Sequence, residues 1–427
     1  MSQYYYDVII AGQSLAATLA GTLLARGGCR VLSISAPVEP PKGWLSSSFH
    51  LEKVLEGMGG RSCFAPPVPF QVLTDQVRLE VLGSCPFEDE LRREFPDNFS
   101  AVSGLFQDLQ ALGQRLEQTL WDAGGLPLLG LSSRLRFFRK GLGKQLSLRA
   151  LAKPLASRWA GIRHAPTRNA LETLFAGLAL ADPGKLSLAE GALLWSGAHR
   201  PDGISSQALL EFLQLRFEQF HGVTEDPGKM RPLEHQGERI TGLSVKEGAR
   251  CAGGHFILAD RSMLKYFPER IAARIKSSPR PVQRSAVEVQ GEKSPLLAPR
   301  VILQGSSPLR LEIASGTQDI SSVLEYRPCD GDPEFDPAAM HQRLGLAFPF
   351  ARMEFPDLPS TPGEASGATG ASNPRLGFPG AFNRLQLGHN SWLCHGESVL
   401  PHLGAIGEML VGVAVANHLL RIIKPRK

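Results

Sequence analysis

The feature that most constrains the fold is a strand, a glycine turn and a helix at the start of the chain. Residues 5–10, YYDVII, have the apolar composition of a short buried strand, and an apolar helix is predicted after Gly12, running to about Arg26. Gly27 and Gly28 then stop the helix, and residues 30–35, RVLSIS, predict a second strand parallel to the first. One strand–helix–strand unit of this kind predicts an α/β protein with a Rossmann-like parallel sheet.

The turn itself has the spacing of a dinucleotide-binding turn. In such a turn the first glycine permits the bend, the second lets the backbone approach a pyrophosphate, and the third allows the helix to pack closely on the strand. Here these places hold Gly12, Ser14 and Ala17, with Leu15 and Ala16 opening the helix. The carboxylate that would bind the adenosine ribose is expected at the end of the second strand, where the chain has Ser35. Dinucleotide binding is one interpretation, and a plain packing turn is the other.

Length and composition narrow the class of protein. A chain of 427 residues with 43% apolar residues is expected to fold into two globular domains. Its six cysteines are scattered without a CxxC pair, which favours reduced thiols in a cytoplasmic protein and predicts no metal site. The amino terminus lacks the basic region of a signal peptide, and no uninterrupted apolar run reaches the roughly 20 residues that span a bilayer.

The rest of the chain predicts an insertion between parts of the first domain. Residues 68–74 and 76–82 alternate like a hairpin, residues 103–125 have helical periodicity, and residues 230–260 predict antiparallel strands that end in a buried one. The expected organisation is a dinucleotide-binding domain interleaved with an α+β substrate domain. The first takes residues 1–60, 201–280 and 386–427, and the second takes residues 61–200 and 281–385, including a flexible Pro/Gly/Ser-rich loop at 355–380.

The last 40 residues carry a second signal for ligand binding. A strand is predicted to deliver Gly396 and Glu397, a turn with Pro401 follows, and a long helix begins near Ala405. Gly412 and Ala416 give this helix a face of small residues. The free N–H groups at such a helix start favour an anionic or electron-rich ligand, although a glycine-capped terminal helix is the plain alternative.

Taken together, these segments resemble the superfamily of FAD-dependent amine oxidases and phytoene desaturases, in which the glycine turn and a C-terminal "GD/E…PGxG…G" segment fold around one flavin. The resemblance implies FAD as the cofactor. It also implies that the acid after the glycine of this segment, Glu397 here, binds the ribitol chain of FAD. The residues implied to bind FAD are Gly12, Ser14, Leu15, Ala16, Ser35, Met230, Gly396, Glu397, Gly404, Ala405, Ile406 and Gly407. The resemblance also implies that Met230 lies where a backbone contact to adenine is expected and that residues 404–407 would face the flavin ring.

Two functions remain open at this stage. The first is an FAD-dependent oxidoreductase that accepts a hydride from a lipophilic or amine substrate. The second is a non-catalytic relative that has lost its cofactor and carries a lipophilic ligand or binds a partner, as the Rab escort and GDP-dissociation inhibitor proteins do. Glu397 and its glycine helix favour the first. Ser35, and the absence of a GGR segment after the second strand, favour the second.

No catalytic residue stands out, and His50, His395 and His402 are expected to be structural. Residues 123–171 contain no acid but ten basic side chains, from Arg134 to Arg168, with Leu and Phe between them. They predict either a solvated surface or a face that docks on an anionic membrane, which would place a cytoplasmic protein at the inner face of a membrane. Nucleic acid is not favoured, because aromatic residues at regular spacing are missing.

Overall fold

The computed structural model describes residues 3–35, 44–143, 147–226, 231–244, 250–275, 282–290, 296–305, 307–314, 319–326, 337–349, 352–354 and 385–423. Met230 and the Pro/Gly/Ser-rich loop at 355–380, both singled out in the sequence, lie outside these residues.

The first sheet is built on the predicted strand pair. Strand β1 pairs in parallel with β2 on one side and with β10 on the other, so the chain returns to the centre of the sheet after more than 200 residues. Strand β9 pairs antiparallel with β10, and β8 pairs antiparallel with β9, while β7 and β16 join the sheet in parallel with β2 and β10. The strands of this first sheet are β7 (Val223–Glu225), β2 (Val31–Ile34), β1 (Gln3–Ala11), β10 (Arg250–Leu258), β9 (Arg239–Ser244), β8 (Glu234–Gln236) and β16 (Ser391–Leu393).

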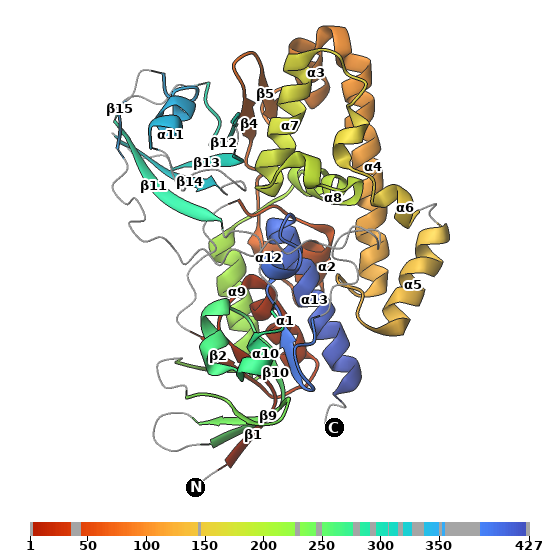
Figure 1. Ribbon diagram of the computed structural model, residues 1–427, viewed down its shortest axis with the longest axis vertical. Coiled ribbons are helices and arrows are strands. Elements are labelled where there is room, and N and C mark those ends of the chain that lie inside the picture. Colours follow the sequence, from red (N-terminus) through yellow and green to blue (C-terminus); the bar gives the residue numbers. More distant parts are fainter. Residues whose placement is uncertain are drawn as a thin grey trace.

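Helices from both ends of the chain pack together against this sheet (Figure 1). Helix α1 ends at Arg26, as predicted, and the C-terminal helix α13 lies against it. By length and composition α13 could cross a membrane, but most of it is buried in the protein, as in a core helix. The helices of this part are α1 (Leu15–Arg26), α2 (Phe49–Met58), α9 (Ser206–Gln219), α10 (Glu269–Ala272), α12 (Gly396–Val399) and α13 (Gly404–Ile422).

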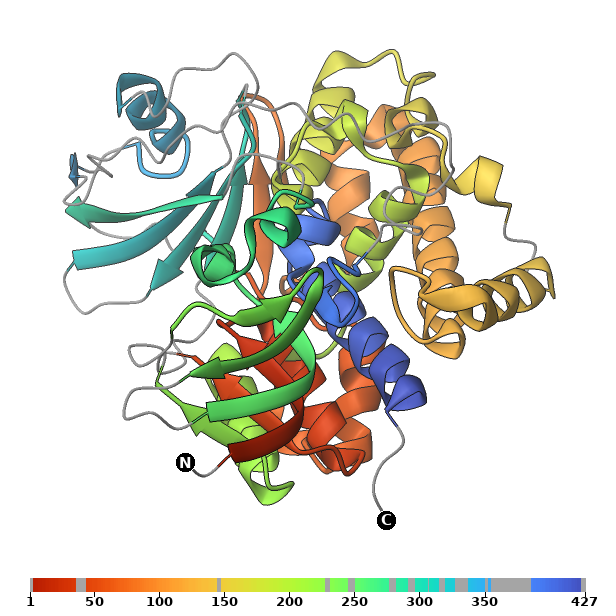
Figure 2. The same cartoon turned by 60° about the horizontal axis from the view of Figure 1, so that its bottom comes forward.

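A second sheet lies beside the first (Figure 2). The predicted hairpin is present, because β4 and β5 pair antiparallel. Strand β4 also pairs in parallel with β12, so β5 is the edge strand of the sheet. In spatial order the strands are β15 (Arg352–Glu354), β11 (Gln283–Gln290), β14 (Asp319–Tyr326), β13 (Leu309–Ala314), β12 (Arg300–Leu303), β4 (Phe70–Leu73) and β5 (Arg78–Val81). Helix α11 (Pro337–Leu344) lies at this end of the molecule, and β3 (Phe64–Ala65) pairs separately with β6 (Gly203–Ile204).

A helical region follows the hairpin in the chain. Its longest helix, α4, contains the periodic stretch predicted at 103–125 except for its last two glycines, and it packs against α8. Within the described part of the basic, acid-free stretch, α5, α6 and the start of α7 are helical, and α5 projects from the side of this region (Figure 1). The helices here are α3 (Phe87–Glu94), α4 (Phe99–Ala123), α5 (Gly130–Gly143), α6 (Leu148–Leu151), α7 (Ala165–Ala179) and α8 (Leu188–Ala198).

Candidate functional site

The glycine turn has the geometry that its sequence predicts. Gly12 follows β1 with a φ of +90°, a conformation that L side chains rarely adopt. A Cβ at this position would also lie 2.8 Å from the Cβ of Asp260, which is the second residue after β10. Gly12 is therefore required both by its backbone conformation and by the packing of two strand ends.

Ser14 caps α1, and its hydroxyl is used within the protein. The oxygen accepts a hydrogen bond from the amide of Ala17 at 3.1 Å, and the O–H donates to the carbonyl oxygen of Cys394 at 2.9 Å. These two bonds join the start of α1 to the end of β16. The serine at the place of the second glycine thus links the two ends of the chain.

Glu408 of α13 occupies the N-terminus of α1. Its Oε2 accepts a hydrogen bond from the amide of Ala16 at 2.9 Å, and its Oε1 accepts one from the amide of Glu397 at 3.1 Å. The first-turn amides of a helix are the groups that bind a phosphate in a dinucleotide site. With Ala17 bonded to Ser14 and Ala16 bonded to Glu408, two of the first three amides of α1 are satisfied inside the chain.

The surroundings of Glu408 are closely packed. A Cβ on Gly396 would lie 2.4 Å from the amide nitrogen of Glu408. Burial, and secondarily the charge of Glu408, raises the pKa of the Cys394 thiol well above its usual value. A carboxylate held by two amides next to a neutral thiol is a stable arrangement for a negative charge.

Glu397, the residue implied to bind the ribitol chain, is the second residue of α12. Its Oε1 accepts a hydrogen bond from the amide of Val282 at 3.3 Å. Burial lowers the pKa of the nearby Arg261 guanidinium, and the charge of Glu397 partly opposes this by raising it. The structure therefore brings Glu397 together with Ala16 through Glu408, and its own carboxylate is directed at Val282.

Ser35 stands at the carboxyl end of β2, at the edge where a ribose carboxylate is expected. The residue is buried, and its amide donates to the carbonyl oxygen of Glu225 in β7 at 3.1 Å. The structure places this residue where the sequence predicted it, with a backbone contact to the neighbouring strand and no acidic side chain of its own.

The residues implied to face a flavin ring form the first turn of α13. Gly404 has a φ of +48°, and Gly407 packs under the preceding turn at Leu400. The buried side chain of Ile406 lies against α8, since a Cβ on Gly197 would be 2.7 Å from its Cδ1. The first turn of α13 is therefore joined to the helical region.

The three histidines make contacts within the protein. His402 bonds through Nδ1 to Oε1 of Glu190 at 3.0 Å, and His395 bonds through Nδ1 to Oγ of Ser398 at 2.8 Å. His50 is fully buried under Trp121, and burial lowers its pKa to about 3.

Sequence reasoning missed Glu408. It is the one acidic residue between Gly404 and Ile422, on a helix otherwise composed almost entirely of small and apolar residues. An acid at that position, four residues after the glycine that opens the helix, was the signal that could have found it.

The comparisons with known proteins agree with this architecture. No protein-family model matches the sequence, and no curated protein sequence matches it either. Among solved structures, cyclohexylamine oxidase from Brevibacterium oxydans superposes with a TM-score of 0.55 at 14% identity, covering 98% of this chain and 99% of that one. Putrescine oxidase bound to putrescine gives 0.53 at 12% identity, covering 98% and 100%.

A Rab GDI from Plasmodium falciparum is also similar, with a TM-score of 0.50 at 11% identity, covering 96% of this chain and 98% of that one. The match to the oxidases extends over nearly the whole length of both chains and includes both sheets. The fold predicted from the glycine turn and the C-terminal segment is confirmed: this chain has the fold of the FAD-dependent amine oxidases.

Proposed function

We propose that this chain is a ligand-binding protein that uses the amine oxidase fold without flavin chemistry. The observation that carries the proposal is the pair of hydrogen bonds from the amides of Ala16 and Glu397 to the carboxylate of Glu408. The function is the second of the two that the sequence left open, in which the fold serves to bind a ligand or a partner.

The residues at the glycine turn do not fit FAD as they stand. A pyrophosphate bound there would need the Ala16 amide, which already binds a carboxylate of the same charge. Two like unit charges about 4 Å apart repel by about 4 kcal/mol at an effective dielectric of 20. Ser35, at the end of β2, offers no carboxylate to a ribose.

The alternative to this proposal is an FAD-dependent oxidoreductase, with a lipophilic or amine substrate as the hydride donor. It is favoured by the fold shared with cyclohexylamine and putrescine oxidases and by the positive-φ turn at Gly12, where a dinucleotide-binding turn has its first glycine. For this function Glu408 would have to leave Ala16 and expose the start of α1.

A titration with FAD separates the two candidates. We expect no flavin bound to the purified wild-type protein and no rise in its melting temperature at saturating FAD. The variant Glu408→Ala should gain a measurable shift, because it frees the Ala16 amide and removes the charge. Glu218→Ala, an exposed glutamate on α9, is the matched control and should behave as wild type. Wild-type protein that purifies with FAD at one equivalent would overturn the proposal.

We also propose that α5 docks on an anionic membrane. Leu131, Leu135 and Phe138 are 83%, 70% and 40% exposed, and their spacing places them on one face of the helix. By the same helical spacing Arg134 and Arg139 flank that face. Apolar side chains bordered by basic ones are typical of helices that lie in the interface of a charged bilayer. A lipophilic ligand could then be taken up from, or delivered to, that surface.

A further inference from the structure

The side chains of two arginines from different helices meet at the first turn of α5. Arg421, in the last turn of α13, donates from Nη1 to the hydroxyl oxygens of Ser132 and Ser133, both at 3.2 Å. Arg136 donates from Nε to the carbonyl oxygen of Ser132 at 3.3 Å. Both guanidinium groups therefore contact Ser132, although α5 and α13 are far apart in the sequence.

The surrounding helices fix the position of Arg421. The turn that ends α4 lies against its guanidinium, because a Cβ on Gly124 would be 3.3 Å from Nη2 of Arg421. Asn417, one turn earlier on α13, donates to the carbonyl oxygen of Gly124 at 3.4 Å. The guanidinium is thus held between α4, α5 and α13 before any ligand binds, which reduces the side-chain entropy lost on binding.

The two positive charges are not compensated by acids. Helix α5 has no acidic residue, and among the described residues neither Arg136 nor Arg421 forms an ion pair. Asp122, near the end of α4, is paired with Lys140 instead, at 3.7 Å. Burial, and secondarily the charge of Arg136, lowers the pKa of the Arg421 guanidinium, as expected for like charges at close range. An anion bound between the two guanidinium groups would relieve their repulsion.

A phosphate monoester has the chemistry that this pair of arginines favours. It carries close to two negative charges at pH 7, because its second pKa is about 6. A guanidinium presents its N–H groups in a planar fork that matches the oxygens of a phosphate, so two of them at one place favour this group over a carboxylate. The hydroxyl of Ser132, which is exposed beside them, can supply a further hydrogen bond.

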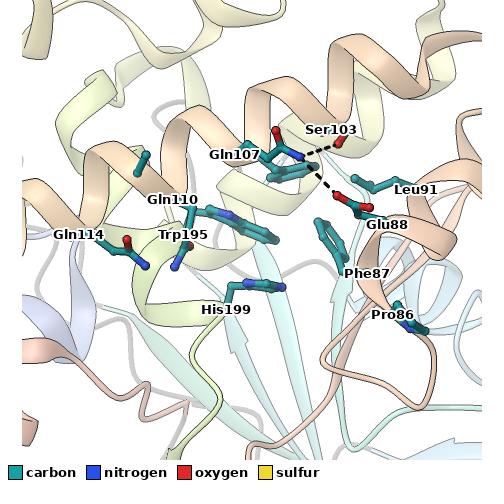
Figure 3. A pocket seen from close by; sticks show the side chains of 12 residues that line it. Pro86, Phe87, Glu88, Leu91, Ser103, Gln107, Gln110, Gln114, Trp195 and His199 are labelled. Atoms are coloured by element: carbon teal, nitrogen blue, oxygen red, sulfur yellow. Dashed lines mark hydrogen bonds between the residues drawn. The ribbon is translucent and has the colours of Figure 1, made fainter.

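The cavity of the helical region has the opposite character (Figure 3). It has a volume of about 550 Å³ and lies between α3, α4 and α8. Its lining includes Glu88 but no lysine or arginine, so an anion is not expected there. Of these two features, the arginine pair is the one suited to a phosphate.

The neighbouring surface indicates that the phosphate belongs to a lipid. The exposed side chains of Leu131, Leu135 and Phe138 form one face of α5. At about 100° per residue, Ser132 lies on the flank of this face, next to Arg139. With the apolar face in the interface of a bilayer, the arginines that contact Ser132 are at the level of the lipid headgroups.

We infer that Arg136 and Arg421, together with Ser132, bind the phosphate monoester headgroup of a membrane lipid. The inference rests on the docking of α5 proposed above and adds to it a preference for one kind of headgroup. It requires neither the presence nor the absence of FAD at the glycine turn.

Flotation of the full chain with two kinds of anionic vesicle tests this preference. One vesicle contains phosphatidic acid, whose headgroup is a phosphate monoester, and the other contains enough phosphatidylserine to give the same surface charge. Wild-type protein should bind the phosphatidic acid vesicle more strongly, by about fivefold or more. Arg136→Gln and Arg421→Gln should each make the two vesicles equivalent. Arg163→Gln, an exposed arginine of the basic stretch outside α5, is the matched control and should keep the preference.

A soluble phosphate monoester distinguishes a lipid ligand from a free phosphate. At constant ionic strength, excess glycerol 3-phosphate should lower binding to phosphatidic acid vesicles to the level seen with phosphatidylserine, because it competes for the two arginines. Calorimetric titration without vesicles should give a Kd for glycerol 3-phosphate weaker than about 0.1 mM. Tighter binding would overturn the lipid as the source of the phosphate.

The two proposals about α5 fail in different ways. Equal binding of wild-type protein to the two vesicles, or a preference that persists in both arginine variants, would overturn the headgroup site and leave the docking of α5 in place. Absence of flotation with either vesicle would refute the docking and the lipid headgroup together. Arg136 is exposed, so its variant is not expected to unfold the protein and keeps the test independent of the packing of α13.

Discussion

Gly412 of α13 lies directly against the backbone of Ala16 in α1. A Cβ at Gly412 would be 2.6 Å from the carbonyl oxygen of Ala16 and 3.2 Å from its Cα. The two helices can approach this closely only because the contact position lacks a side chain. The same approach brings Glu408, one turn earlier on α13, within reach of the Ala16 amide.

Adding one methyl group at this contact should destabilise the protein. Gly412→Ala forces the helices apart, and we expect a loss of about 1–3 kcal/mol in the free energy of unfolding, the usual cost of overpacking. Gly104→Ala on α4 is the matched control, because a Cβ there meets nothing within 4 Å. That change should stabilise the protein by about 0.4–1 kcal/mol. Urea denaturation of both variants measures the difference, and equal midpoints would contradict the close contact.

Removing the Glu408 carboxylate should also cost stability. In Glu408→Ala the amides of Ala16 and Glu397 lose their acceptor, and leaving such groups without partners costs about 1–3 kcal/mol. Glu408→Gln keeps one amide oxygen as acceptor and should lose less. Chemical denaturation without FAD is the measurement. If both variants are as stable as wild type, the carboxylate does not hold the two chain ends together.

His50 should make the protein less stable in acid. Burial, which outweighs a hydrogen bond to the Leu120 carbonyl, lowers its pKa to about 3 in the folded state, against about 6.5 unfolded. As pH falls below 6.5, His50 becomes protonated in the unfolded chain but stays neutral in the folded protein. The free energy of unfolding should therefore decrease by up to about 1.4 kcal/mol per pH unit until pH 3.

His50→Leu should reduce this slope, measured by denaturant titration at pH 7 and pH 5. His199, His255 and His418 also have lowered pKa values, so some acid sensitivity remains. His389→Leu, at an exposed position, is the control. An unchanged slope in His50→Leu would show that this histidine is not held neutral in the folded protein.

Local sequence signals predicted the local structure well. The apolar run before Gly12, the glycines after Arg26 and the alternating residues of the hairpin act over a few positions, and the structure has β1, α1 and the β4–β5 pair there. The basic stretch was harder to interpret. Its lack of acids suggested a solvated surface or a docking face, and neither interpretation specified a helix. Leu, Arg and Lys also favour helix, which the structure shows as α5.

Contacts between residues far apart in the sequence, on which the proposed function depends, could not be predicted from these local signals. Glu408 reaches Ala16 across 392 positions, and only the packing of α13 on α1 reveals that it fills the turn. Arg421 likewise contacts Ser132 across 289 positions. Helical periodicity places Ser132 and Arg136 on one side of α5, but it does not show that α13 brings a second arginine to the same serine.

The α5 helix provides the test of membrane docking. Wild-type protein should float with vesicles containing anionic lipid and remain behind with neutral ones, and the binding should weaken as salt rises, because salt screens the attraction between Arg134, Arg139 and the lipid headgroups. Each near-surface basic residue contributes about 1 kcal/mol. Arg134→Glu with Arg139→Glu should therefore abolish flotation.

The apolar face of α5 should matter independently of the charge. Leu131→Asp with Leu135→Asp removes the side chains expected to enter the interface, and we expect flotation to be lost at low salt, where the basic residues alone are attracted most strongly. Leu215→Asp is the matched control, because Leu215 is 53% exposed on α9, away from the basic stretch. If the α5 variant floats as well as the control, Leu131 and Leu135 do not enter the bilayer, and the attraction of α5 to vesicles is due to its charge alone.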